Sequence, residues 1–119
     1  LVLGECLPGG TTTALCVLRA LGYRAKVSSC LKENPVALKE TFAEAAVAKV
    51  REAGVTDPLD IVSLVGDPMI PVAAGIAEGF CGKLFLAGGT QMLAAAALIR
   101  ALGNLPRNGR RGWSGCLLC

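Results

Sequence analysis

The first thirteen residues, Leu1-Val2-Leu3-Gly4-Glu5-Cys6-Leu7-Pro8-Gly9-Gly10-Thr11-Thr12-Thr13, decide how the fold begins. The three apolar residues at the start are typical of a strand, and the two adjacent glycines are typical of a tight loop. The apolar run over 14–21 then predicts a buried helix that is ended by Gly22. The order of strand, glycine loop and helix predicts the first unit of an α/β fold.

The loop between this strand and this helix predicts an anion site. Gly9 and Gly10 would let the backbone approach a ligand without an intervening Cβ. The hydroxyls of Thr11, Thr12 and Thr13, with the free N–H groups of the first helical turn, favour a phosphate there. The loop has neither the Lys of a Walker A sequence nor the glycine spacing of a dinucleotide fold. A simple tight turn with a threonine N-cap is the alternative that the spacing leaves open.

The same pattern recurs twice farther along the chain. The repeats consist of a strand, a glycine turn and a helix at 59–65, Gly66-Asp67 and 71–80, and again at 83–87, Gly88-Gly89-Thr90 and 91–102. Such alternation predicts an α/β fold, a three-layer Rossmann-like parallel sheet built from repeated strand, glycine-loop and helix units. Ligands bind outside the carboxyl ends of parallel strands, so we expect the three turns to converge on one ligand site.

The remaining segments are less regular. Residues 23–31 predict a short strand or an extended loop, and Asn34-Pro35 predicts the start of a helix over 35–53. The apolar residues of that helix, expected to face the core, are Leu38, Phe42, Ala45, Ala46 and Val50, whereas Lys39 and the other charged residues are expected on the solvated side. Residues 104–119 predict an irregular basic tail, either a flexible extension or a segment foreign to the natural protein. Because the chain opens inside an apolar strand without an initiator Met, we expect residues 1–103 to be part of a larger domain.

Composition narrows the classes of function. Apolar residues make up 53% of the 119 residues and aromatic residues only 4%, which favours close-packed helices over a sheet without an aromatic platform for nucleic acid. The formal charge of +3 comes from the arginines after residue 103, so we expect no nucleic-acid or membrane partner. Neither a signal peptide nor an apolar run of the ~20 residues that a membrane span needs is expected. Irregularly spaced cysteines and the absence of His favour reduced thiols, a cytoplasmic location and no metal or cofactor.

Three motifs together resemble a known family. The motifs are Gly4 to Ala14, Val65-Gly66-Asp67-Pro68-Met69-Ile70 and Leu86-Ala87-Gly88-Gly89-Thr90-Gln91-Met92. In this order they look like the archaeal and cyanobacterial branch of the nicotinate-nucleotide:dimethylbenzimidazole phosphoribosyltransferase family, whose members are much longer. Gly4, Glu5, Gly9, Thr11 and Thr12 match the first motif of the well-studied bacterial enzymes. Leu7, Gly10 and Ala87 depart from the family pattern, and Ala87 stands where those enzymes have a carboxylate.

The resemblance implies transfer of 5-phosphoribose from nicotinate mononucleotide to a benzimidazole-type base, in synthesis of the lower ligand of cobamides (vitamin B12). It implies that Glu5, with Asp67 second, stabilises the cationic transition state. The residues it implies for binding nicotinate mononucleotide, or another ribosyl phosphate, are Gly9, Gly10, Thr11, Thr12, Gly66, Gly88, Gly89 and Thr90. The family's general base lies beyond the matched part, so this chain alone is expected to be inactive. A homodimer is a further expectation from the family. The alternatives are a non-catalytic phosphate- or nucleotide-binding module and a structural module built on the Ala-rich helices.

Overall fold

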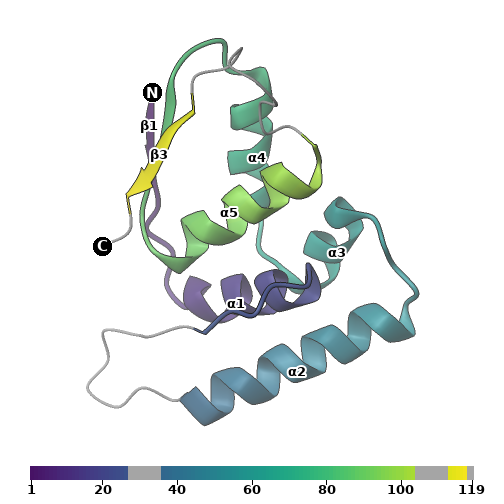
Figure 1. Cartoon of the computed structure of the whole chain (residues 1–119). Coiled ribbons are helices and arrows are strands. Elements are labelled where there is room, and N and C mark those ends of the chain that lie inside the picture. The colour runs from purple at the N-terminus through teal and green to yellow at the C-terminus, as the bar shows by residue number, and fades with distance from the viewer. Residues whose placement is uncertain (27–35, 104–112, 118–119) are drawn as a thin grey trace.

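The computed structural model describes residues 1–26, 36–103 and 113–117. Within these ranges the protein is a mixed α/β structure in which a small parallel sheet is joined to five helices (Figure 1). In chain order the elements are β1 (Val2–Gly4), α1 (Gly10–Ala20), α2 (Val36–Glu52), α3 (Pro58–Val65), α4 (Met69–Gly79), β2 (Leu84–Ala87), α5 (Thr90–Ala101) and β3 (Trp113–Leu117). No helix among the described residues is long and apolar enough to cross a membrane.

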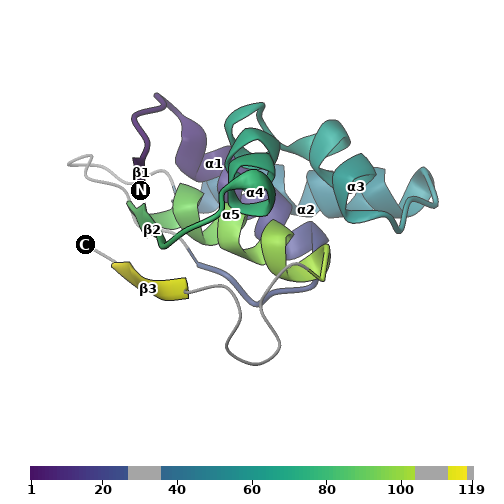
Figure 2. The ribbon, with the colours of Figure 1, turned by 90° about the horizontal axis from the view of Figure 1, so that it is seen from above.

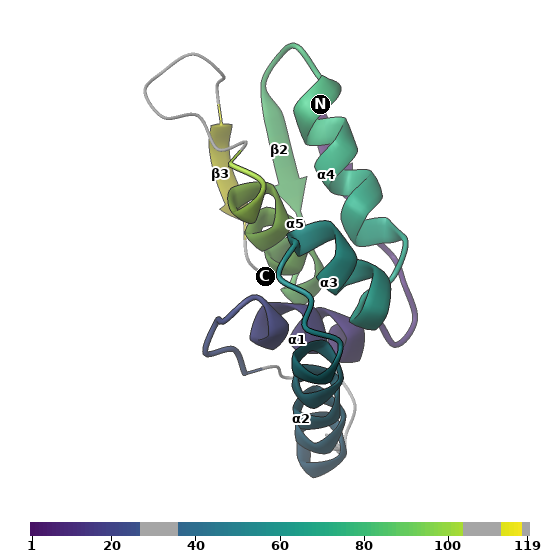
Figure 3. The same ribbon diagram turned by 90° about the vertical axis from the view of Figure 1, so that its right-hand side faces the viewer.

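The sheet has the strand order β1-β2-β3, and both pairs of neighbours are parallel. Seen from above, the five helices lie to one side of the strands (Figure 2). The residues of β2 alternate accordingly: Leu84 and Leu86 are buried, whereas Phe85 and Ala87 are half-buried. One face of the described sheet therefore carries the core. Figure 3 shows β2 and β3 running side by side, with α5 following from the end of β2.

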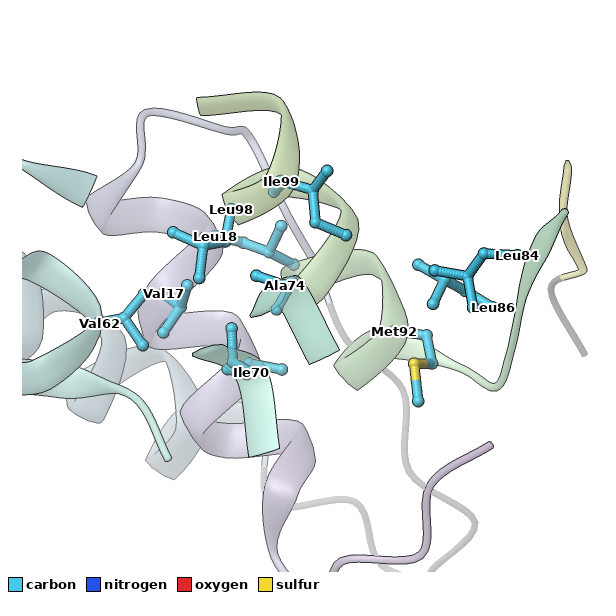
Figure 4. Close-up of a cluster of buried hydrophobic side chains, with 13 residues drawn as sticks. Val17, Leu18, Val62, Ile70, Ala74, Leu84, Leu86, Met92, Leu98 and Ile99 are labelled. Carbon is cyan, nitrogen blue, oxygen red and sulfur yellow. The ribbon is translucent and has the colours of Figure 1, made fainter. Parts of the chain in front are cut away.

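The core forms where α1, α4 and α5 meet each other and the sheet. Figure 4 shows Leu84 and Leu86 of β2 pointing toward Met92 of α5, with Ile70 and Val17 farther along the same apolar layer. Helix α1 is well enclosed, since it packs against α2, α3 and α5 and its Ala14, Leu15 and Val17 have no exposed surface. This burial holds the start of α1, and with it the glycine loop, in a fixed place.

Most of the expected elements are present. The strand at the N-terminus, the first helix, the long helix and the last repeat of strand and helix are confirmed by β1, α1, α2, β2 and α5, and the helix expected over 71–80 by α4. The region expected to be an irregular tail contains β3, which adds a parallel strand beside β2. Residues 27–31 of the segment expected to be a strand or loop lie outside the described residues, and residues 23–26 form neither helix nor strand.

The strand expected over 59–65 is wrong, because these residues form the helix α3. The Asp57 carboxylate accepts hydrogen bonds from the amides of Leu59 and Asp60, and Pro58 occupies the first turn, so the helix has both an N-cap and a favourable first residue. Ile61 and Val62 are buried on one side. An apolar run of eight residues can form either a buried strand or a buried helix, because the two have similar composition. Here the cap by Asp57 and Pro58 favours the helix.

The face of α2 that packs on the core also differs from the expectation. Leu38 and Phe42, expected to be buried, are 56% and 54% exposed, and Ala45 is exposed as well. In place of these three, the residues one position farther along the helix are buried, Lys39, Ala43 and Ala46, and Val50 is buried as expected. Ala43 and Ala46 pack against Leu15 and Cys16, because small side chains let the α1 and α2 backbones approach closely. Ala46 and Val50 are therefore confirmed as core residues, and the solvated position expected for Lys39 is wrong.

Candidate functional site

Of the three glycine turns expected to converge at one edge of the sheet, the two that follow β1 and β2 meet there. The parallel register pairs Gly4 at the end of β1 with Ala87 at the end of β2. The next residues, Glu5 and Gly88, consequently lie side by side. A Cβ placed on Gly88 would lie 3.4 Å from both Cγ and Oε1 of Glu5 and 2.8 Å from Cγ of Met92. The Glu5 carboxylate therefore stands directly against the turn that leads into α5.

The first turn ends at the N-terminus of α1, with Gly9 as the N-cap. Gly9 has φ +77°, a left-handed conformation that glycine adopts without steric cost. The amides of Gly10 and Thr12 donate to the carbonyls of Leu7 and Gly9, at 3.2 and 3.1 Å. The Thr11 amide has no backbone acceptor among the described residues. Thr11 and Thr12 are half-buried, so their hydroxyls lie close to the loop surface.

The second turn ends at the N-terminus of α5, where Gly89 is the N-cap and no side chain caps the helix. In the described part of the chain, the amides of Thr90, Gln91 and Met92 donate to no backbone carbonyl. Unpaired donors at a helix start, together with the positive end of the helix dipole, favour an anion. The edge thus combines the starts of two helices, α1 and α5, with the carboxylate of Glu5.

Gln91, which was not among the site residues predicted from the sequence, joins the two turns. Its side chain is only 4% exposed, and its Nε2 donates to the Leu7 carbonyl at 3.1 Å. Gly10 lies directly below this amide, since a Cβ on Gly10 would overlap Nε2 and lie 2.5 Å from Cδ of Gln91. The glycine therefore makes room for a side chain of the protein. The signal in the sequence was a polar residue in the first turn of an otherwise apolar helix.

The third turn, Gly66-Asp67, reaches the edge by a different route, because it joins α3 to α4 and follows no strand. Asp67 Oδ2 accepts a hydrogen bond from the hydroxyl of Thr13 at 2.7 Å, and Oδ1 accepts one from the Met69 amide at 3.0 Å. The same Thr13 hydroxyl lies 3.0 Å from the Gly10 carbonyl. Asp67 is thereby tied to the first turn of α1 through Thr13, whose hydroxyl was expected to point at the ligand and instead donates to this carboxylate.

Gly66 lies away from the surface of the turns. A Cβ at this position would lie 2.7 Å from the Val62 carbonyl and 3.0 Å from Cγ2 of Val17. The packing of α3 against α1 thus accounts for a glycine here. The residues brought together at the edge are Glu5, Gly9, Gly10, Thr11, Thr12, Gly88, Gly89 and Thr90, with Asp67 held at its margin.

The Glu5 carboxylate is only partly engaged. Its Oε2 accepts a hydrogen bond from the Leu7 amide at 3.3 Å, a long and exposed contact, and the residue is half-buried. Asp67, in contrast, uses both carboxylate oxygens in contacts within the protein. Of the two candidate acids, Glu5 has more capacity left for a ligand. No group of three His, Cys, Asp or Glu within the described ranges could hold a metal ion.

Comparison with known proteins places similar sequences in archaea. The chain is 52% identical over 108 residues to a "UPF0284 protein" of Thermococcus onnurineus, which covers 86% of this chain and 31% of the relative. The "UPF0284 protein" of Archaeoglobus fulgidus is 50% identical over 105 residues, covering 88% of this chain and 30% of the relative. The "UPF0284 protein" of Methanosarcina mazei is 45% identical over 111 residues, covering 86% of this chain and 31% of the relative. No protein-family profile matches the chain. The chain therefore spans about a third of the length of these curated relatives, whose names carry no activity, ligand or partner.

Proposed function

We propose that this chain is the phosphate-binding part of a longer phosphoribosyltransferase, which transfers 5-phosphoribose from nicotinate mononucleotide to a benzimidazole-type base. The observation that carries the proposal is the contact between Glu5 and Gly88 at the carboxyl ends of β1 and β2. It sets a carboxylate beside the starts of two helices. Such an edge suits a ligand with a phosphate at one end and a developing positive charge at the other.

The phosphate is assigned to the open amides at the start of α5 and to Thr11 of α1. Positioning the sugar phosphate in this way can contribute several kcal/mol to lowering the barrier. Glu5 is assigned to the ribose, where its carboxylate would accept hydrogen bonds from hydroxyls and stabilise positive charge on the ring. No metal is required for this chemistry.

Asp67 receives a supporting role in this proposal. Both of its oxygens already accept hydrogen bonds, one from Thr13 and one from the Met69 amide. It would hold the first turn of α1 in place and would not touch the ribose. Asp67 is therefore a positioning residue, and Glu5 is the catalytic candidate.

The rest of the longer protein would complete the site. We propose that it extends the small sheet into a three-layer Rossmann-like domain and supplies the general base, so that the present chain alone turns over no substrate. A homodimer and a cytoplasmic location belong to the same proposal.

Binding is tested by thermal melts of this chain with nicotinate mononucleotide. Ligand at a hundred times its dissociation constant adds about 2.7 kcal/mol, on the order of 10 °C for a domain of this size. Thr11→Val should remove most of the shift. Glu52→Gln at the exposed end of α2 is the matched control, and it should leave the shift unchanged. Gly10→Val is a poor control, because the new side chain would displace Gln91 and change the fold itself.

Catalysis is tested with the longest natural form of the protein that contains these residues. Mixed with nicotinate mononucleotide and 5,6-dimethylbenzimidazole, it should form the riboside phosphate, detected by mass spectrometry. Glu5→Gln should lower kcat by about a hundredfold, the loss typical of removing one transition-state-stabilising group. Ligand binding without product would favour the alternative, a non-catalytic phosphate- or nucleotide-binding module. If the protein neither binds nicotinate mononucleotide nor forms product, both functions are refuted.

A further inference from the structure

A cavity of about 500 Å³ lies beside the edge just described, between the segment 23–26 that follows α1 and one side of α5. Its apolar floor is made by Leu18 of α1 and by Leu93 and Ala96 of α5. Three basic residues surround the floor: Arg24, Lys26 and Arg100. No acidic residue is among the described residues that line it.

The three basic side chains of this cavity are exposed and form no ion pair with a described carboxylate. The neighbouring Arg19 behaves differently. It forms an ion pair with Glu40 of α2 and donates from Nε and Nη2 to the Ala25 carbonyl, at 3.3 and 3.2 Å. The Arg19 guanidinium is therefore already engaged by Glu40 and by the carbonyl of Ala25, the residue between Arg24 and Lys26. These contacts fix the chain at Ala25, and the flanking Arg24 and Lys26 also line a smaller hollow together with Arg19.

A second cavity provides an internal comparison. It measures about 570 Å³, lies among α1, α2, α3 and the end of α5, and has Arg51 as the one charged residue among its described lining. The two cavities are similar in size and both are largely apolar. They differ in charge, because three basic residues line the cavity beside α5 and only Arg51 lines the other among the described residues. Three unpaired cations around an apolar hollow attract a multiply charged anion more strongly than one does.

We propose that the cavity beside α5 binds a phosphate monoester whose organic part is apolar. The phosphate dianion would pair with Arg24, Lys26 and Arg100, since guanidinium groups bind phosphate oxygens in a bidentate manner. The organic part would lie on Leu18, Leu93 and Ala96 and displace water from them. The cavity adjoins the Glu5 edge, because Thr90 lines it, but its three cations belong to neither glycine turn. The inference does not rest on the proposed transferase activity.

The test is a titration of this chain, followed by calorimetry, with three probes. 1-Naphthyl phosphate carries both the dianion and the ring, inorganic phosphate only the anion, and 1-naphthol only the ring. We expect 1-naphthyl phosphate to bind at least tenfold more tightly than either single-part probe, and its affinity to fall as salt is raised. Equal binding of 1-naphthol would overturn the proposal, since the cations would then contribute nothing. No binding at about 1 mM 1-naphthyl phosphate would overturn it as well.

Variants then locate the binding. Arg24→Gln and Arg100→Gln should each weaken 1-naphthyl phosphate binding by about tenfold, because a charge-assisted hydrogen bond is lost. Ala96→Phe should abolish it by filling the floor. Arg51→Gln is the control for charge and should change the dissociation constant less than about twofold. A melt of each variant confirms that it is folded.

Thr11→Val and Glu5→Gln separate this inference from the proposed function. Neither residue lines the cavity, so both variants should bind 1-naphthyl phosphate as the wild type does. Loss of binding in Thr11→Val, with Arg24→Gln unaffected, would place the probe at the glycine turns and refute the cavity as its site.

Discussion

The turns after β1 and β2 contain the same three letters, Gly-Gly-Thr, but they are packed in opposite ways. In Gly9-Gly10-Thr11 the first glycine is open and left-handed, and the second is pressed against Gln91. In Gly88-Gly89-Thr90 the first glycine is pressed against Met92 and Glu5, and the second has no atom near the position of a Cβ. The same short motif therefore serves two different packing arrangements.

The difference teaches that a glycine pair alone does not identify a ligand loop. Gly10 is needed because the Gln91 side chain fills the space that a Cβ would occupy. Gly88 is needed because the Glu5 side chain and α5 approach it. Only the parallel pairing of β1 with β2 brings these partners together, which is why the motif becomes a candidate site in three dimensions.

The strongest test of this comparison is Gly10→Ala. The added Cβ would force out the Gln91 side chain, break its bond to the Leu7 carbonyl and crowd the start of α1. We expect the free energy of unfolding to fall by about 3 kcal/mol, as measured by urea denaturation. In a Gln91→Ala background the same substitution should be neutral or slightly stabilising, because alanine is the better helix former. An equal loss in both backgrounds would mean that Gln91 is not the reason for the glycine.

A second test compares two Asp-Pro pairs, each of which begins a helix. Asp57 caps α3 through local bonds, whereas Asp67 also accepts the Thr13 hydroxyl from α1. We expect Asp57→Ala to cost about 1 kcal/mol and Asp67→Ala about 2 kcal/mol in the free energy of unfolding. With Thr13→Val already present, the two costs should become similar. If Asp67→Ala still costs twice as much in that background, the contact with Thr13 is not what distinguishes the two aspartates.

Thiol labelling compares the surface of the first turn with the helix that follows it. Cys6 lies exposed in the turn, whereas Cys16 is buried in α1, and burial raises the pKa of the Cys16 thiol despite the nearby Arg19. A raised pKa leaves less reactive thiolate at a given pH. With iodoacetamide near pH 8, peptide mapping by mass spectrometry should find Cys6 modified at least about tenfold faster than Cys16. Equal rates in the folded protein would show that the first turn and α1 open together.

The smallest effect is expected at Gly75, a glycine with no packing partner. It lies exposed inside α4, and a Cβ there would meet no atom within 4 Å. Gly75→Ala should therefore raise the free energy of unfolding by about 0.5 to 1 kcal/mol, because it removes conformational freedom from the unfolded chain. Thermal melts check the direction. If Gly75→Ala instead lowered the free energy of unfolding, the free space around a Cβ would not predict the effect of adding one, and the same reasoning for Gly10 and Gly88 would fail.

The sequence by itself determined the elements whose signals are local. Glycines at turns and apolar runs identified β1, α1, β2, α4 and α5. Once β1 and β2 pair in parallel with Gly4 opposite Ala87, Glu5 must lie beside the Gly88 turn. The candidate residues at this edge were therefore within reach of sequence reasoning. Asn34-Pro35 and the helical periodicity likewise predicted α2.

Tertiary structure decided what depends on a partner distant in the chain. Helix α2 turned Ala43 and Ala46 inward, where they pack against Leu15 and Cys16 of α1. The roles of Gln91 and Thr13 likewise come from contacts with Leu7 and Asp67, 84 and 54 residues away. Helix α3 is different, because its Asp57 cap is a local signal that stands beside it in the sequence. Local patterns record which side chains are apolar or flexible. Which neighbour fills a given space, and which hydrogen-bonding group is left open, depends on how the helices pack against the sheet.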